Sequence, residues 1–136
     1  MKINGVELNF ELYDSNNIKL RKRYFKELGK LRGISKSMPK GADERTQIEY
    51  FCGKIKKVFD KVFYTGAGDE VCGEGNNLLK CMNAYEQLVS DQIRQNNEYN
   101  AIIEKIRNIK NDNLNDLAES VPDLSELSGD VDEPAD

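Results

Sequence analysis

Apolar and polar residues alternate along the first dozen positions of the chain. Val6, Leu8, Phe10 and Leu12 would share one face of an extended segment, and the residues between them are polar. This period of two predicts a short β element over residues 2–12. The pair Asn4-Gly5 is typical of a type I′ turn, so the first residues are expected to fold back as a stub strand. Two strands alone are only marginally stable, and we therefore expect their apolar face to pack on helices.

Two later segments show the spacing of three and four residues that marks amphipathic helices. The first is predicted over residues 16–32, between the N-cap candidates Asp14-Ser15 and a stop at Gly33. The second is predicted over residues 43–63, after a loop over residues 35–41. This second helix has the widest apolar stripe of the chain, which consists of Ile48, Phe51, Cys52, Ile55, Val58, Phe59, Val62 and Phe63.

A glycine-punctuated joint follows, and a long third helix is predicted from about residue 77 to residue 110. Its apolar positions alternate at spacings of four and three, which suits a helix packed along a partner helix. Gln92 and Asn96 interrupt this seam. Either they form a polar layer that fixes the register, or the helix leaves the core, breaks or bends there. The full seam is Leu78, Met82, Tyr85, Val89, Gln92, Asn96, Tyr99, Ile103, Ile106 and Lys110.

The composition changes at residue 111. From there onward the chain holds nine acidic residues and no lysine or arginine, whereas residues 1–110 carry 15 acids and 20 bases. The net charge of −4 therefore divides into a body of +5 and a tail of −9. We predict a domain over residues 1–110 and an acidic, mostly disordered tail over residues 111–136. The predicted fold class is α+β and predominantly helical, with a short N-terminal β element packed on about three helices.

The residue types present argue against an enzyme. The chain has no histidine, which removes the commonest general base and every serine–histidine or cysteine–histidine arrangement. Cys52, Cys72 and Cys81 cannot all pair with one another, and three thiols alone do not complete a tetrahedral zinc site. We interpret them as buried structural thiols in a reducing cytoplasm. The prediction is a protein with no catalytic residue, no cofactor and no metal.

Gly66, Gly68, Gly73 and Gly75 in the joint invite comparison with a phosphate-binding loop. Their spacing fits neither of the two common glycine-rich phosphate motifs, and no lysine, serine or threonine follows to hold phosphate or magnesium. The nearby acids do not supply the alternating ligands of a calcium loop either. We predict that these glycines serve positive-φ turns between two helices.

A basic stretch over residues 19–32 is the one feature that suggests nucleic acid. Five of its bases would share a helix face, and Lys54, Lys57 and Lys61 would form a second strip. No recognition motif accompanies them, and the acidic tail would compete for the same surface. A solvated helix face, or docking of the protein's own tail, is the favoured interpretation. The five bases are Lys19, Lys22, Arg23, Lys26 and Lys30.

Two blocks of the sequence carry a resemblance to a known family. The first is the opening MKINGVELNFELYD, and the second runs from Val58 to Val89. In the second block a helix ends in F-D-x-x-F, a glycine-rich turn and a C/F-G pair follow, and then N-x-x-x-C-x-x-A-[YF]-E. The matching positions are Phe59, Asp60, Phe63, Gly66, Gly68, Cys72, Gly73, Asn77, Cys81, Ala84, Tyr85 and Glu86. The chain resembles small proteins encoded by phages and prophages of low-GC Gram-positive bacteria, over most of residues 1–90.

Such proteins are similar in size and layout to tail assembly chaperones of long-tailed phages, which bind the tape measure protein. The resemblance implies a non-enzymatic tail assembly chaperone in the cytoplasm of the host cell. Its expected partner is the tape measure or another tail protein, without membrane or nucleic acid, and self-association is compatible with the sequence. The alternatives are a phage-encoded inhibitor of a host defence protein that uses the acidic tail, and a nucleic-acid-binding accessory protein. The predicted partner-binding residues are Tyr85, Val89, Tyr99, Ile103, Ile106, Leu114, Leu117 and Leu124.

Overall fold

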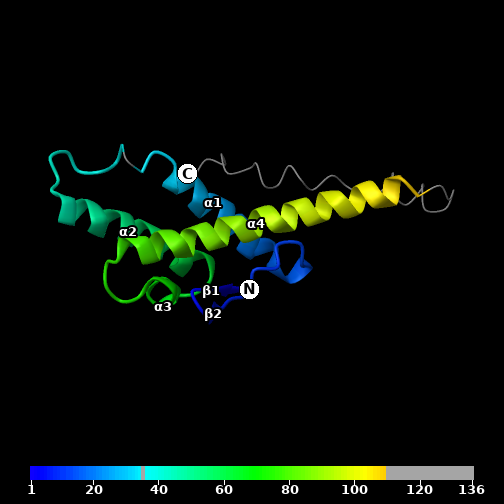
Figure 1. The fold of residues 1–136 in the computed structure, drawn as a ribbon, viewed down its shortest axis with the longest axis horizontal. Coiled ribbons are helices and arrows are strands. Elements are labelled where there is room, and N and C mark those ends of the chain that lie inside the picture. Colours follow the sequence, from blue (N-terminus) through cyan, green and yellow to red (C-terminus); the bar gives the residue numbers. More distant parts are fainter. Residues whose placement is uncertain (35, 110–136) are drawn as a thin grey trace.

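A computed structural model describes residues 1–34 and 36–109 of the chain. Within these residues a two-stranded hairpin precedes four α-helices (Figure 1). The strands are β1 (Lys2–Ile3) and β2 (Val6–Glu7), and a 3₁₀ turn, η1, spans Ser15–Asn17. The helices are α1 (Ile18–Leu31), α2 (Glu44–Val62), α3 (Ala67–Cys72) and α4 (Leu78–Arg107). The predicted fold class, helical with a small N-terminal β element, is confirmed.

The hairpin forms where the sequence predicts it. Asn4 and Gly5 both have positive φ, 49° and 88°, as a type I′ turn requires. The antiparallel ladder pairs Lys2 with Glu7 and Ile3 with Val6. The strands are shorter than predicted, because residues 8–12 belong to neither strand. Of these residues, Leu8 still bonds to the backbone of Met1, at 2.7 Å and 3.2 Å. Their alternation is nevertheless confirmed, since Leu8, Phe10 and Leu12 are buried and the residues between them are exposed.

The three long helices begin and end close to the predicted positions, and their caps explain why. Asp43 accepts a hydrogen bond from the Thr46 amide at 2.8 Å, and Asn77 accepts one from the Lys80 amide at 3.1 Å. Both are N-caps that satisfy free amides of a first turn. After α1 the chain turns at Gly33, whose φ is +70°. None of the described helices combines the length and the apolar character that crossing a membrane requires.

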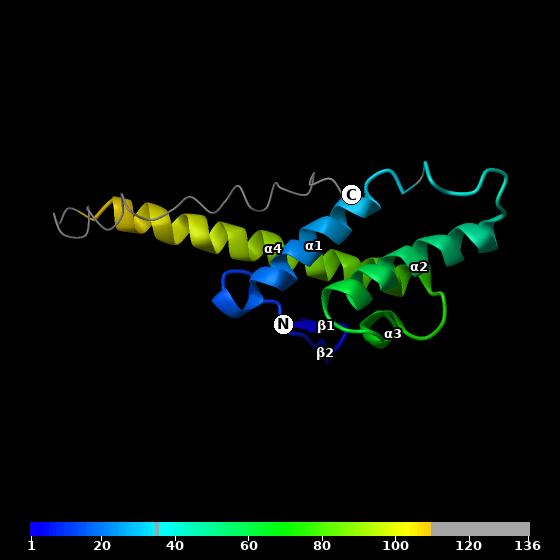
Figure 2. The same cartoon turned by 180° about the vertical axis from the view of Figure 1, so that it is seen from behind.

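The core lies between α1, α2, α3 and the first half of α4, and buried residues of the N-terminal segment over residues 3–12 pack into it (Figure 2). Aromatic rings fill its centre. The ring of Phe10 lies 5.0 Å from that of Tyr24 in an edge-to-face arrangement, and 5.7 Å from that of Phe63. Burial of large apolar side chains of this kind is the main favourable term in folding.

Helix α3 was not predicted, because the joint reads as a loop. Its backbone is fixed by Asp60, whose Oδ1 accepts hydrogen bonds from the amides of Gly66 at 3.2 Å and Gly68 at 2.7 Å. Gly66 and Gly73 have φ of 98° and 85°, so the predicted positive-φ role is confirmed for these two. Gly68 serves close packing instead, since a Cβ there would lie 2.5 Å from the carbonyl oxygen of Lys56.

The seam predicted for the third helix is displaced by about one residue. The residues of α4 that are buried are Cys81, Ala84, Leu88, Gln92 and Gln95, whereas Met82 is 51 % exposed. Small residues at 81 and 84 let the hairpin and α3 approach the helix closely. The larger Leu78, Met82 and Tyr85 are left at the edge of the core, and none of the three is fully buried.

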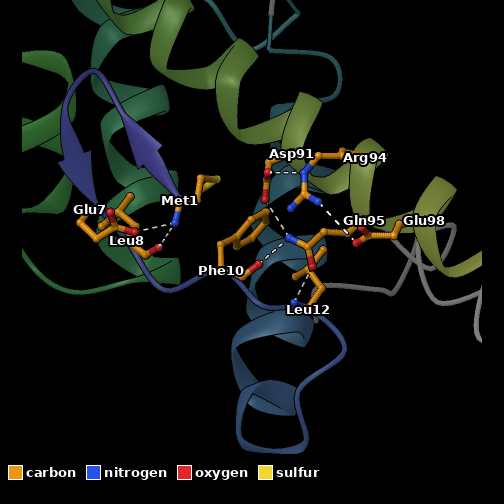
Figure 3. A network of polar contacts seen from close by, with 9 residues as sticks. All are labelled: Met1, Glu7, Leu8, Phe10, Leu12, Asp91, Arg94, Gln95 and Glu98. Atoms are coloured by element: carbon orange, nitrogen blue, oxygen red, sulfur yellow. Dashed lines mark hydrogen bonds and ion pairs between the residues drawn. The ribbon is translucent and has the colours of Figure 1, made fainter.

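Gln92 and Asn96 do not break the helix, which is continuous over Leu78–Arg107. The Tyr24 hydroxyl donates to Gln92 at 3.1 Å, and the Tyr13 hydroxyl donates to Asn96 at 2.8 Å. Gln95 donates to the Phe10 carbonyl at 2.6 Å and accepts from the Leu12 amide at 2.8 Å (Figure 3). A polar layer thus ties the N-terminal segment to α4. The predicted disorder of residues 111–136 lies outside the described residues.

Candidate protein-binding groove

An open apolar groove runs between the end of α1, the middle of α2 and the start of α4. Its volume is about 390 Å³, and seven side chains line it: Leu31, Ile34, Phe51, Ile55, Leu78, Met82 and Tyr85. All seven are apolar or aromatic. A concave apolar surface that faces solvent is a typical site for an apolar side chain of a ligand or partner.

Local backbone chemistry positions the two lining residues at the end of α1. The Ile34 amide donates to the Leu31 carbonyl at 3.2 Å. The left-handed conformation of Gly33 between them turns the chain back over the end of the helix. Ile34 is therefore a half-buried apolar residue on a polar loop, and it closes one end of the groove.

The wall formed by α4 is the more exposed one. Met82 is 51 % exposed, and its neighbour Leu79, just outside the groove, is 74 % exposed. Tyr85 is half-buried, and burial raises the pKa of its hydroxyl above the ordinary value of 10.0. Met82 is unbranched and adapts to partners of different shape. The α4 wall therefore offers a flexible apolar contact to a side chain bound in the groove.

The charge beside the groove is positive. Residues 28–42, which include Leu31 and Ile34, carry four bases and no acid: Lys30, which pairs with Glu27 on the preceding turn, and Arg32, Lys36 and Lys40. Lys54 lies on α2 between the lining residues Phe51 and Ile55. A partner that combines apolar side chains with acidic ones is the best electrostatic match for this surface.

A second hollow, of about 520 Å³, lies between the N-terminal segment and the second half of α4. Its lining is mixed: Glu11, Tyr13, Asp14, Arg94, Gln95, Glu98, Tyr99 and Ile102. Arg94 is held by Asp91 at 3.0 Å and by Glu98 at 3.4 Å (Figure 3). These ion pairs raise the pKa of Arg94 above its ordinary value, first through the hydrogen bond with Asp91. The surface here is polar, and its one lining base, Arg94, is already paired with acids.

The structure does not bring the predicted partner-binding residues into one site. Tyr85 lines the apolar groove, and Tyr99 lines the polar hollow. Val89 is half-buried between them, and Ile103 and Ile106 lie in the last turns of α4, which extend away from the rest of the molecule (Figure 2). The remaining three, Leu114, Leu117 and Leu124, lie outside the described residues.

Six lining residues were absent from the predicted set of partner-binding residues: Leu31, Ile34, Phe51, Ile55, Leu78 and Met82. Phe51, Ile55 and Met82 belong to the stripes that the sequence indicates, but periodicity cannot tell a groove wall from a core position. Ile34 is the one lining residue whose sequence context could have indicated a position in the groove. It is a large apolar residue in a segment otherwise made of glycine, serine and basic residues.

The basic stretch of α1 is partly used inside the fold. The Arg23 guanidinium donates to the carbonyl oxygens of Lys61 at 3.1 Å and Val62 at 3.0 Å, at the end of α2. Arg21 donates to the Leu12 carbonyl at 2.8 Å, and Lys30 pairs with Glu27 at 3.1 Å. Arg23 thus satisfies carbonyls that a helix end leaves unpaired. These contacts reduce the case for a nucleic-acid surface.

The three cysteines are buried, as predicted, and come from three different helices. Burial, followed by a hydrogen bond with Cys81, raises the pKa of Cys52 to about 12. Burial also raises the pKa of Cys72 and of Cys81. Such thiols are unreactive at neutral pH, because the thiolate is the nucleophile. Among the described residues no group of three or more histidine, cysteine or acidic side chains could hold a metal ion.

The chain matches the model of a known protein family. A family of unknown function, DUF6673, matches residues 4–116, and the chain belongs to this family. The match includes the hairpin turn, all four helices, the whole groove and residues up to Asp116. Neither the curated proteins nor the solved structures contain a match to the chain.

Proposed function

We propose that this member of the DUF6673 family is a non-enzymatic protein that binds an apolar helical segment of another protein. The proposal goes further to a tail assembly chaperone of a long-tailed phage, with the tape measure protein as partner. The apolar groove lined by Leu31, Ile34, Phe51, Ile55, Leu78, Met82 and Tyr85 is the observation that carries the binding function. The phage assignment draws its support from the resemblance of the sequence.

The groove favours a helical guest for a physical reason. An amphipathic helix presents apolar residues at i, i+3, i+4 and i+7, and such a row of anchors fits an elongated apolar groove. Full burial of one leucine or phenylalanine side chain contributes about 1.5–3 kcal/mol. A few such anchors outweigh the entropic cost of ordering a short segment. Holding the apolar face of an unassembled protein in this way prevents its aggregation.

The test is co-expression of the full chain with the tape measure protein, followed by a pull-down and a titration of the purified pair. Met82→Asp places a charge on the exposed wall of the groove. We expect it to weaken binding about tenfold or more, which corresponds to at least about 1.4 kcal/mol. Ile18→Asp is the matched control, because Ile18 is 43 % exposed and lies at the opposite end of α1.

A third variant separates the groove from the end of α4. Ile102 is 51 % exposed, as Met82 is, but lies about 30 Å further along the helix at about 1.5 Å per residue. If the groove is the site, Ile102→Asp binds the partner like the parent chain. Binding lost in Ile102→Asp and kept in Met82→Asp would move the site to the end of α4. A pull-down that recovers no tape measure protein would overturn the phage assignment.

A further inference from the structure

The groove and the acidic tail have matching chemistry. The tail combines nine acids with the apolar residues Leu114, Leu117, Val121, Leu124 and Leu127. The groove is apolar, and the chain segment that contributes Leu31 and Ile34 to it, residues 28–42, carries four bases and no acid, with Lys30 paired to Glu27. The tail therefore has both properties that the groove demands of a guest. No other segment of the chain of similar length combines this acidity with several leucines.

Chain length decides which leucines can reach the groove. Met82 lies about 38 Å before Arg107 along α4, at about 1.5 Å per residue. An extended chain spans at most about 3.3–3.6 Å per residue. Ten residues beyond Arg107, Leu117 extends to about 33–36 Å, which at full extension only just spans the distance of about 33 Å to Tyr85 and falls short of Met82. Leu124 extends to about 56–61 Å and reaches it.

The reachable segment also has the right local pattern. Leu124 and Leu127 are three residues apart, so that one helical turn would place both on the same face. Pro122 is compatible with the first turn of such a helix, and Asp123 is favourable next to its positive end. On such a helix Asp123, four residues before Leu127, would lie at the edge of the apolar face, with Glu126 further round the helix.

We propose that the segment Val121–Leu127 docks in the groove of its own chain, with Leu124 and Leu127 as anchors, and so competes with the protein partner. The competition rests on the proposed function, whereas the docking does not. The tail is tethered, so its local concentration is high even if its intrinsic affinity is weak. A partner segment with more anchors displaces it. The tail then keeps the apolar groove covered until that partner is present.

Paramagnetic relaxation tests the docking in the full chain. Ser125→Cys supplies a thiol for a spin label, and the three native thiols do not compete because each is at most 1 % exposed. We expect methyl signals of Met82 and Ile34 to lose intensity, while the methyl signals of Ile18 keep theirs. The loss should also diminish as salt rises, because about 1 M salt shortens the screening length to about 3 Å.

Two controls separate docking from a general attraction between charges. In the first, Leu124→Asp and Leu127→Asp are added to the labelled chain, which makes the tail more acidic and removes its anchors. Recovery of the Met82 and Ile34 signals supports the proposal. Intensity loss that persists, or that spreads evenly over the basic face of α1, overturns it.

In the second control, spin-labelled chains without isotopes are mixed with isotope-labelled chains that lack the spin label. Signal loss in this mixture means that the tail docks on another copy, which overturns docking in its own chain. The same anchor substitutions should raise the affinity for the tape measure protein, and an unchanged affinity overturns the competition alone. Failure of that partner to bind leaves the docking result intact, since the relaxation experiment contains no partner.

Discussion

Two glycines inside helices show how the surroundings of a residue decide its effect on stability. Gly53 lies in α2, and a Cβ added there would meet no atom within 4 Å. Gly68 lies in α3, and a Cβ added there would lie 2.5 Å from the carbonyl oxygen of Lys56 on α2. Neither residue has positive φ. The sequence shows glycine at both positions, whereas the structure predicts opposite effects of a methyl group added there.

Gly53→Ala is expected to stabilise the protein by about 0.5–1 kcal/mol, because glycine loses more conformational entropy in a helix than alanine. Gly68→Ala is expected to destabilise it by about 1–3 kcal/mol, since α3 must move away from the α2 backbone. Urea unfolding of the two variants measures both free energies. Equal effects of the two substitutions would contradict the close approach of α3 to α2.

The buried thiols predict a dependence of stability on pH. Cys52 has a pKa near 12 in the folded protein against an ordinary value of 9.0. Its contribution is fully present below pH 9 and is lost as the pH rises from 9 toward 12, since the unfolded thiol ionises first. Burial also raises the pKa of Tyr24, which adds a change of the same sign. The free energy of unfolding should therefore fall above pH 9.

The substitution Cys52→Ala separates the contribution of the Cys52 thiol to this pH dependence from that of Tyr24. The variant should lose less stability than the parent chain between pH 9 and pH 11, because Tyr24 alone then remains of this pair of groups. Urea titrations across this range give the comparison. If the two curves run parallel, the ionisation of Cys52 does not contribute.

At the scale of the elements, the sequence predicts the ends of the helices well and their buried faces less well. The caps Asp43 and Asn77 and the turn at Gly33 fix helix ends by local chemistry, which is why they can be predicted. The face of α4 that is buried depends on what packs against it. The predicted seam did not identify this face. Segments distant in the sequence pack on the side of α4 that carries the small Cys81 and Ala84, and not on the side of the larger Met82.

One side chain of α4 pairs two backbone groups of the segment over residues 8–12. Gln95 hydrogen-bonds the Phe10 carbonyl and the Leu12 amide, and it also donates to Asp91 at 2.8 Å. Gln95→Met keeps the volume but leaves these backbone groups unpaired. The expected loss is about 1–3 kcal/mol of stability, and the Leu12 amide should exchange its hydrogen faster. Gln47→Met is the control, since Gln47 is exposed and its loss should change stability by less than about 0.5 kcal/mol.

At the scale of the whole molecule, a packed body carries one projecting helix end (Figures 1 and 2). Tyr13 of the body and Tyr99 of α4 form a ring contact near the start of this projecting end, with ring centroids 4.9 Å apart and planes within 6° of parallel. The groove of the proposed function lies in the body, at the other end of α4. The sequence predicts the length of this helix, but not where along it the packing ends, because apolar residues continue to Ile109.

Hydrogen exchange along α4 tests this division. Amides from Cys81 to Gln95 lie in the packed part and should exchange only through global unfolding, whereas those from Ile103 to Arg107 should exchange through local opening. The change between the two regimes is expected near Tyr99. Tyr13→Ala removes both the ring stack and the hydrogen bond to Asn96, so the boundary should move toward Gln92. Uniform protection along the whole helix would mean that the end of α4 is covered, by the same chain or by another copy. Repeating the measurement at several protein concentrations then decides which, because only contact with another copy weakens on dilution.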